Sequence, residues 1–159
     1  ATGGGDPSRS GELILWNVET KAIARQFVDA HSDTVFGIDF SRDGKYLVSG
    51  GADKFVKQFE VETGKLVRSF EGHTHHVLDV SWKADSSRIA SAGADNAIKV
   101  WNFATGEQNR TISTATKQVP AIKSIGVSDN IVSYAGDRIV RSQPANTGTN
   151  CRNVPGAAD

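Results

Sequence analysis

The chain has 159 residues and balances 18 Lys and Arg against 18 Asp and Glu, which gives a formal net charge of zero. Neutralising nucleic-acid phosphates needs clustered positive charge, and no run of Lys or Arg occurs, so nucleic acid is excluded as the main partner. No apolar segment approaches the ~20 residues that cross a bilayer, so we expect a soluble chain with no membrane partner and favour the cytoplasm as its compartment.

Short apolar runs follow one another along the chain and indicate strands rather than helices. The segment 31–72 holds four of them, VFGIDF, YLVSG, FVKQF and LVRSF, separated by the turn sequences RDGK, GGAD and ETGK. Apolar and polar residues that alternate over short runs, bounded by Gly and Asp, are typical of antiparallel strands joined by tight turns. The segment therefore predicts one four-stranded antiparallel sheet.

The same segment recurs along the chain at a spacing of 42 residues. Val35 aligns with Val77 and Asp53 with Asp95 without a gap, and a third copy begins at Ala115. In chain order we expect an incomplete unit that matches strands two to four (1–28), two full units (29–71 and 72–113), a degenerate unit (114–156) and the start of another repeat (157–159). Four-stranded sheets that repeat in this way pack face to face around an axis, so the sequence predicts an all-β propeller.

Short motifs inside the units resemble those of a known family. "GH" at Gly72 and His73 precedes the first strand of one unit, Asp95 lies in its second turn, and "VWN" ends its third strand at Trp101 and Asn102. "AH" and "LWN" take the corresponding places in the earlier units. The units resemble WD-repeat (WD40) blades over nearly the whole chain. The amino-acid sequences of the repeats resemble those of bacterial members. The resemblance implies a β-propeller of three full blades and one blade that lacks its first strand.

The resemblance also implies a structural role for four side chains of each blade. In the family, the His of the Gly-His pair, a Ser or Thr of the second strand, the turn Asp and the third-strand Trp form a buried hydrogen-bonded group. By motif position the group consists here of His73, Ser91, Asp95 and Trp101, of His31, Ser49 and Asp53, of Ser133 and Asp137, and of Trp16 in the incomplete blade. Buried polar side chains are tolerated when they are paired, and these can satisfy one another.

A set of Ser, His and Asp also allows a hydrolase triad, in which Asp orients His and His activates Ser. Repetition argues against a triad, because the set recurs with Phe59 in the Trp place, and no Gly-x-Ser-x-Gly motif accompanies it. We therefore expect no catalytic residues and no enzyme. In the degenerate blade, Ala115 replaces His and Gln143 replaces Trp, so we expect a weaker group there.

The run "HTHH" raises the question of a metal site. His75 and His76 lie in a loop where the other copies carry different residues, and no second cluster with zinc-like spacing exists, so we expect no metal. The single cysteine, Cys151, excludes a multi-cysteine cluster and an intrachain disulfide. "ATGGGD" lacks the Lys-Ser/Thr of a phosphate-binding loop, so we expect no cofactor.

The resemblance places partner binding on the face that this loop helps to form. The candidate contact residues, taken from repeat position, are Asp33, Thr34, Phe36, Lys54, His75, His76, Leu78, Asn96, Lys117, Gln118 and Arg138. We expect a non-catalytic scaffold that binds a protein or peptide and assembles. The alternatives are a structural or engineered propeller fragment that self-assembles without a ligand, and a sensor or accessory propeller of a larger bacterial enzyme.

An incomplete blade predicts incomplete closure of the ring. An open ring leaves unpaired strand edges that favour association. The sequence allows three outcomes: a fragment of a longer propeller, a homodimer that completes a ring of about eight blades, or a strained four-bladed ring. The first is favoured as the origin of the sequence, and the second as its state in isolation.

Overall fold

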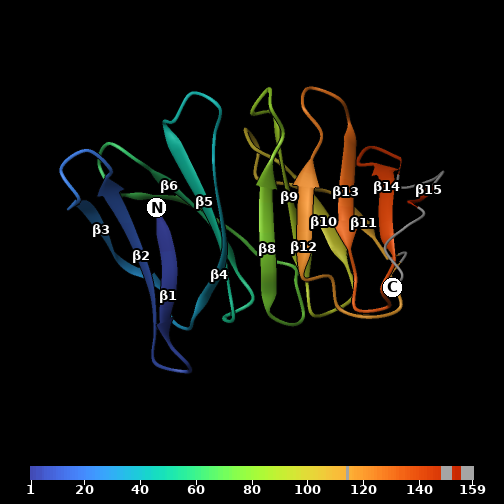
Figure 1. Cartoon of the computed structure of the whole chain (residues 1–159), viewed down its shortest axis with the longest axis horizontal. Helices are drawn as coiled ribbons and strands as arrows, with labels where there is room; N and C mark the ends of the chain where they lie inside the picture. The colour runs from blue at the N-terminus through green and yellow to red at the C-terminus, as the bar shows by residue number, and fades with distance from the viewer. Residues whose placement is uncertain (114, 148–151, 155–159) are drawn as a thin grey trace.

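The computed structural model describes residues 1–113, 115–147 and 152–154, which form fifteen strands in four antiparallel sheets. The sheets stand side by side in chain order, with β1 and β14 toward opposite ends of the row (Figure 1). Within the described ranges, no helix is long and apolar enough to cross a bilayer. Cys151, the end of the degenerate unit and residues 157–159 lie outside the described residues.

The sheets match the predicted propeller architecture. Among the described residues the first sheet has three strands and each of the others has four, in chain order within each sheet, which confirms three full units and one without its first strand. The strands of the first two sheets are β1 (Thr2–Asp6), β2 (Ser10–Asn17) and β3 (Ala22–His31), then β4 (Val35–Phe40), β5 (Tyr46–Gly51), β6 (Val56–Glu60) and β7 (Leu66–Phe70). Those of the last two are β8 (Val77–Trp82), β9 (Arg88–Gly93), β10 (Ile98–Asn102) and β11 (Gln108–Ile112), then β12 (Ala121–Ser124), β13 (Asn130–Tyr134), β14 (Val140–Pro144) and β15 (Arg152–Asn153).

Small residues set the distance between neighbouring sheets. A Cβ added to Gly50 of β5 would lie 2.5 Å from Val77 Cγ1 of β8, and one added to Gly37 of β4 would lie 2.6 Å from the Cα atom of Asp79. Ala92 takes the place of Gly50 in the third sheet and is fully buried against the fourth. Since interiors are packed without room for extra atoms, the close approach of these backbones depends on the absence of larger side chains.

Side-chain oxygens of the first strands bond to the backbone of the following sheet. Asp39 of β4 accepts a hydrogen bond from the Trp82 amide at 2.8 Å, and Ser81 Oγ of β8 accepts one from the Ser124 amide at 3.1 Å. Lys123 Nζ of β12 reaches back past the third sheet to an Asp39 carboxylate oxygen, 3.1 Å away. A single carboxylate therefore connects the second, third and fourth sheets.

Arginines of the last strands hold the neighbouring sheet at its outer side. Arg68 Nη1 of β7 donates to the Thr105 carbonyl oxygen of the third sheet at 2.6 Å, and Arg25 of β3 makes equivalent bonds to a turn of the second. These turns contain Gly64 and Gly106, whose φ angles of 74° and 80° lie in the left-handed region. A Cβ on Gly64 would lie 2.8 Å from Arg25 Cδ, so glycine also leaves room for the arginine.

The face of the fourth sheet that points away from the third exposes apolar side chains. Tyr134 and Val154 are 41% and 45% exposed. By repeat position they correspond to Ala92 and Ile112 of the third sheet, which are buried. The difference arises because the described residues place no further sheet against this face.

We predict that Gly37→Ala destabilises the protein by about 1–3 kcal/mol, because the added methyl group meets the backbone of β8. Gly4→Ala is the matched control, since no atom lies within 4 Å of a Cβ at that position of β1. Urea unfolding followed by tryptophan fluorescence measures both. Equal unfolding midpoints for the two variants would show that the distance between sheets does not depend on Gly37.

Candidate functional site

In the third sheet, four side chains form one hydrogen-bonded chain. Trp101 Nε1 lies 2.8 Å from Ser91 Oγ, Ser91 Oγ lies 2.8 Å from His73 Nε2, and His73 Nδ1 lies 2.9 Å and 3.0 Å from the two Asp95 carboxylate oxygens. Ser91 is fully buried, and His73 and Trp101 are nearly so. β8, β9 and β10 and their connections bring these residues together from positions up to 28 apart in the chain, His73 to Trp101.

One assignment of protons satisfies every group in this chain. Trp101 N–H donates to Ser91 Oγ, the Ser91 hydroxyl donates to His73 Nε2, and His73 Nδ1–H donates to Asp95. Burial lowers the pKa of His73, although the Asp95 charge opposes the shift, so the ring is neutral near pH 7. Burial raises the pKa of the Asp95 carboxyl, but His73 and the amides of Thr74 and Ala97 outweigh that effect and leave the pKa below its usual value.

The second sheet contains the same group without its tryptophan. His31 Nδ1 lies 2.9 Å from an Asp53 oxygen, and His31 Nε2 lies 2.7 Å from Ser49 Oγ. Phe59 fills the tryptophan position and packs edge-on against Phe27 of the first sheet, with ring centroids 5.3 Å apart. Since Phe59 has no N–H to donate, this group ends at the serine.

In the fourth sheet, an arginine replaces the missing histidine. Arg141 Nη2 and Nη1 of β14 lie 2.6 Å and 3.0 Å from the two Asp137 oxygens, and both side chains are about nine-tenths buried. The guanidinium of Arg141 lowers the pKa of the Asp137 carboxyl. Ser133 is buried in the same sheet, and Gln143 is buried at the tryptophan position. Arg141 was not among the residues expected from the sequence; Lys57 and Lys99 hold the same repeat position in the other full sheets, but both bond elsewhere.

Trp16 does not belong to a buried group. Its Nε1 donates to Thr2 Oγ1 at 2.9 Å, and the residue is 40% exposed. Trp16 therefore makes one bond of the predicted group, the counterpart of the bond from Trp101 to Ser91, but in an exposed place. The physical reason is that no first strand and no histidine-bearing loop cover this tryptophan within the described residues of the first sheet.

The polar groups hold each loop before a first strand against the turn between the second and third strands. In the third sheet the Thr74 amide donates to Asp95 at 3.1 Å, and the Ala94 amide donates to the His76 carbonyl at 2.9 Å. The other two full sheets repeat this pattern. We define the loop face by two sets of segments from the three full sheets. The loops before the first strands, extended to the repeat position of Phe36, are 32–36, 74–78 and 116–120. The turns between the second and third strands are 52–55, 94–97 and 136–139.

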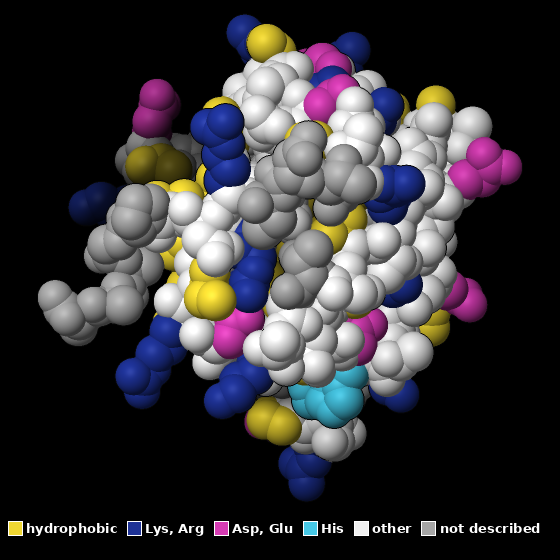
Figure 2. All heavy atoms as spheres, turned by 90° about the vertical axis from the view of Figure 1, so that its right-hand side faces the viewer, with side chains coloured by type: hydrophobic (Ala, Val, Ile, Leu, Met, Phe, Trp, Pro, Cys, Tyr) yellow, Lys and Arg dark blue, Asp and Glu magenta, His cyan; other side chains and the backbone are white. Residues whose placement is uncertain are grey.

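All eleven candidate contact residues lie on the loop face. Phe36, Lys54, His75, Lys117, Gln118 and Arg138 are exposed, and Asp33, Thr34, His76, Leu78 and Asn96 are half-buried. The histidine side chains visible in Figure 2 gather at one end of the molecule, which is the lower end of the sheets in Figure 1. The structure thus places the candidate residues on one surface, and their role in binding stays a prediction.

The Ser-His-Asp sets are not arranged for nucleophilic attack. Ser91 is 0% exposed, and its Oγ is occupied by both His73 and Trp101. A nucleophile needs an accessible oxygen beside its base. Of the residues described, no three His, Cys, Asp or Glu side chains are close enough together to hold a metal ion.

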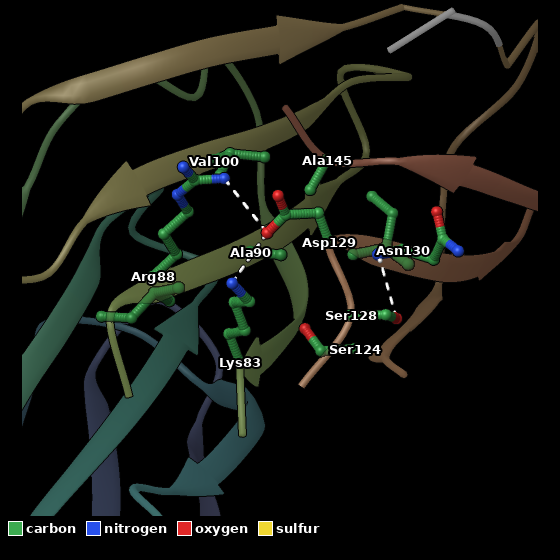
Figure 3. Close-up of a pocket in the computed structure, with 11 residues that line it drawn as sticks. Lys83, Arg88, Ala90, Val100, Ser124, Ser128, Asp129, Asn130 and Ala145 are labelled. Carbon is green, nitrogen blue, oxygen red and sulfur yellow. Dashed lines mark hydrogen bonds and ion pairs between the residues drawn. The ribbon is translucent and has the colours of Figure 1, made fainter. Parts of the chain in front are cut away.

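A small cavity lies between the third and fourth sheets on the side opposite the loop face. Its volume is about 10 Å³, which is room for one water molecule at most. Lys83 Nζ and Arg88 Nη1 lie 2.7 Å and 3.4 Å from an Asp129 oxygen at its mouth (Figure 3). The ion pairs join two sheets, and the space beneath them is too small for a substrate.

Comparisons with known proteins agree with this geometry. The family model for the WD40 repeat, described as "WD domain, G-beta repeat", matches residues 24–60 and 64–102. Over 57 residues the chain is 40% identical to U3 small nucleolar RNA-associated protein 12 of Saccharomyces cerevisiae, covering 35% of this chain and 6% of that protein. Over 58 residues it is 38% identical to WD repeat-containing protein SL1-17 of Schistosoma mansoni, covering 36% of this chain and 19% of that protein.

Another relative is DDB1- and CUL4-associated factor 13 of Dictyostelium discoideum, 40% identical over 55 residues, or 35% of this chain and 12% of that protein. The solved structure named "Structure of U3-55K" superimposes with a TM-score of 0.84 at 24% identity, over 89% of this chain and 45% of that one, and shows the fold alone. The chain spans only a fraction of the length of each relative. These relatives do not support a bacterial origin.

The lowered pKa of His73 predicts a pH dependence of stability. Below about pH 6.5, His73 of the unfolded chain binds a proton that folded His73 does not bind. The free energy of unfolding should therefore decrease as the pH is lowered, by up to about 1 kcal/mol between pH 6.5 and 5.5. His73→Gln should reduce this dependence, and exposed His75→Gln should retain it. An NMR titration of the wild-type ring gives an independent measurement, and a His73 midpoint at or above 6.5 would contradict the assignment.

The Arg141–Asp137 pair predicts that a histidine at position 115 restores stability lost by changing Arg141. Arg141→Lys keeps the positive charge but cannot form the pair of parallel hydrogen bonds to Asp137, so the melting temperature should fall by about 5 °C because the buried carboxylate loses part of its hydrogen bonding. Adding Ala115→His supplies the imidazole found in the other sheets and should recover part of the loss. Arg138→Lys, an exposed change nearby, should leave the melting temperature unchanged. If Ala115→His lowers stability further, a histidine–Asp137 hydrogen bond cannot replace the Arg141–Asp137 ion pair.

Proposed function

Because the chain belongs to the WD40-repeat family, we propose that it is a non-catalytic scaffold that binds a protein or peptide on its loop face. WD40-repeat proteins act in general as interaction scaffolds. Two of the relatives are named for such associations, one with U3 small nucleolar RNA and one with DDB1 and CUL4. Those associations belong to the relatives, and what extends to this chain is the general role.

The observation that carries the proposal is an exposed aromatic residue on a rigid surface. Phe36 is 49% exposed at the start of β4, and its ring lies 6.1 Å from that of His76 in the neighbouring sheet. The backbone beneath is fixed by the His31–Asp53 and His73–Asp95 groups. Aromatic side chains on a preorganised surface bind partners well because little conformational freedom is lost on binding.

Assembly with a second copy stays a prediction. The exposed face of the fourth sheet favours association, but the first sheet is a poor match for it. Lys21, with φ of 55°, takes the position of Gly64 and Gly106, where glycine leaves room for an arginine of the preceding sheet. A second copy therefore could not repeat this contact at the first sheet, and the mass in solution, 17.0 kDa for one chain, tests whether it binds otherwise.

Selection of random peptides on the immobilised protein tests the proposed function. We expect the selected peptides to bind Phe36→Asp at least about tenfold more weakly than the wild type, because the change removes an aromatic contact and buries a charge. The control is Val127→Asp, at a 68%-exposed valine in the turn between β12 and β13, on the opposite side. Peptides that bind both variants equally, or that lose binding only to Val127→Asp, would refute the loop face as the binding surface.

A further inference from the structure

We propose that the loop face selects an acidic segment that also carries apolar side chains. This inference rests on the proposed function, since it names the chemistry of the partner for the same surface. Its basis is a difference in exposure: three cations on this face are exposed and form no ion pair among the described residues, whereas three of its carboxylates are at least about nine-tenths buried.

Three cations on the loop face are free to bind a partner. Lys54, Lys117 and Arg138 are exposed, and none of them forms an ion pair within the described residues. Lys54 and Arg138 occupy left-handed turn positions, with φ of 75° and 66°. A Cβ added to Gly136 would lie 3.4 Å from the Cβ atom of Lys117, so Lys117 sits against the turn that carries Arg138.

The carboxylates of the same turns are bonded within the protein, and most of them are buried. Asp53 and Asp95 bond to buried histidines, and Asp137 bonds to Arg141. Asp33 accepts hydrogen bonds from its own neighbour, the Thr34 amide, at 2.7 Å and from the Ser8 amide at 2.8 Å.

Two further exposed carboxylates, Asp29 and Glu71, lie where the last strands end, at the outer edge of the sheets. The three free cations lie at the tips of the turns and at the starts of the first strands. The charged side chains that a partner could reach on the inner part of the loop face are therefore mainly cations, although the whole chain is neutral.

Apolar side chains repeat at one position of the same face. Phe36 and Leu78 hold the same repeat position in β4 and β8, and exposed Pro120 holds it immediately before β12. These three residues come from three neighbouring sheets and form one apolar row. A partner that matches the row needs apolar side chains, and one that matches the flanking cations needs carboxylates.

The row favours a peptide over a nucleic acid. Binding a phosphate backbone depends on many cations that follow the strand, and its salt dependence grows with the number of phosphates neutralised. Here only three exposed cations share the face with an apolar row, which fits a segment of acidic and apolar side chains better. Opposite potentials on the two surfaces would also speed the encounter and exclude basic competitors.

Fluorescence anisotropy with two synthetic peptides tests the proposal. Each has about a dozen residues with the same leucines and phenylalanines, and one carries glutamates where the other carries lysines. The glutamate peptide should bind the wild type at least about tenfold more tightly at low salt, and the difference should shrink as salt is added.

Charge-reversal variants connect binding to the named residues. Lys54→Glu, Lys117→Glu and Arg138→Glu combined should weaken binding of the glutamate peptide by about tenfold or more. The matched control combines Lys21→Glu, Lys45→Glu and Lys65→Glu, which change the net charge equally at exposed turns on the opposite side. Thermal unfolding confirms that both triple variants are folded.

The outcomes separate this inference from the proposed function. If peptides chosen by random selection bind the loop face but are insensitive to the charge reversal, the scaffold stands and the acidic partner is refuted. Equal weakening by both triple variants would show a general charge effect and also refute it. Tighter binding of a single-stranded RNA oligonucleotide than of the glutamate peptide, lost in the first triple variant, would replace the peptide with nucleic acid. If no peptide binds the loop face, both proposals fail.

Discussion

A buried histidine with both ring nitrogens bonded is the constraint on which the loop face depends. His73 can stay neutral inside the protein because Asp95 accepts from one nitrogen and Ser91 donates to the other. The same carboxylate accepts from the Thr74 amide, so the loop and the turn cannot move apart without leaving charge or amide groups unpaired. Residues on the loop and on the turn therefore keep a fixed position relative to one another.

Periodicity predicted the strands, because their apolar residues alternate and the same pattern returns at one spacing. Family resemblance predicted which polar residues meet. Neither could predict Arg141, since Lys57 and Lys99 hold its repeat position and bond elsewhere, to the Ala30 carbonyl in one case and to the side chains of Gln108 and Thr111 in the other. In the fourth sheet the histidine is absent, and only a side chain long enough to reach Asp137 could replace it.

The hydrogen bonds that arginines make to neighbouring sheets were not predicted from the sequence, for a related reason. Arg25 bonds to a carbonyl 38 residues away and Arg68 to one 37 away, and an exposed arginine has no preferred direction that sequence alone reveals. A signal was nevertheless present, because Arg25 and Arg68 occupy matching positions in their units and glycine stands at both sites of contact, at Gly64 and Gly106. Aligning the units for long side chains opposite glycine would have found these contacts. Alignment for apolar residues alone did not.

The same repeat that builds the scaffold leaves the loop face variable. Asp33, His75 and Lys117 occupy one position in three successive sheets and differ in charge, whereas the Asp of the neighbouring turn is kept in all three. The bonded carboxylate fixes the backbone, and the residue at the loop position varies: Asp33 accepts a hydrogen bond from the Ser8 amide of the first sheet, whereas Lys117 forms no ion pair among the described residues. Function in such a fold resides in the residues that the fold does not need. The cations Lys54 and Arg138 meet that description, since each follows a bonded aspartate and its side chain forms no hydrogen bond or ion pair among the described residues.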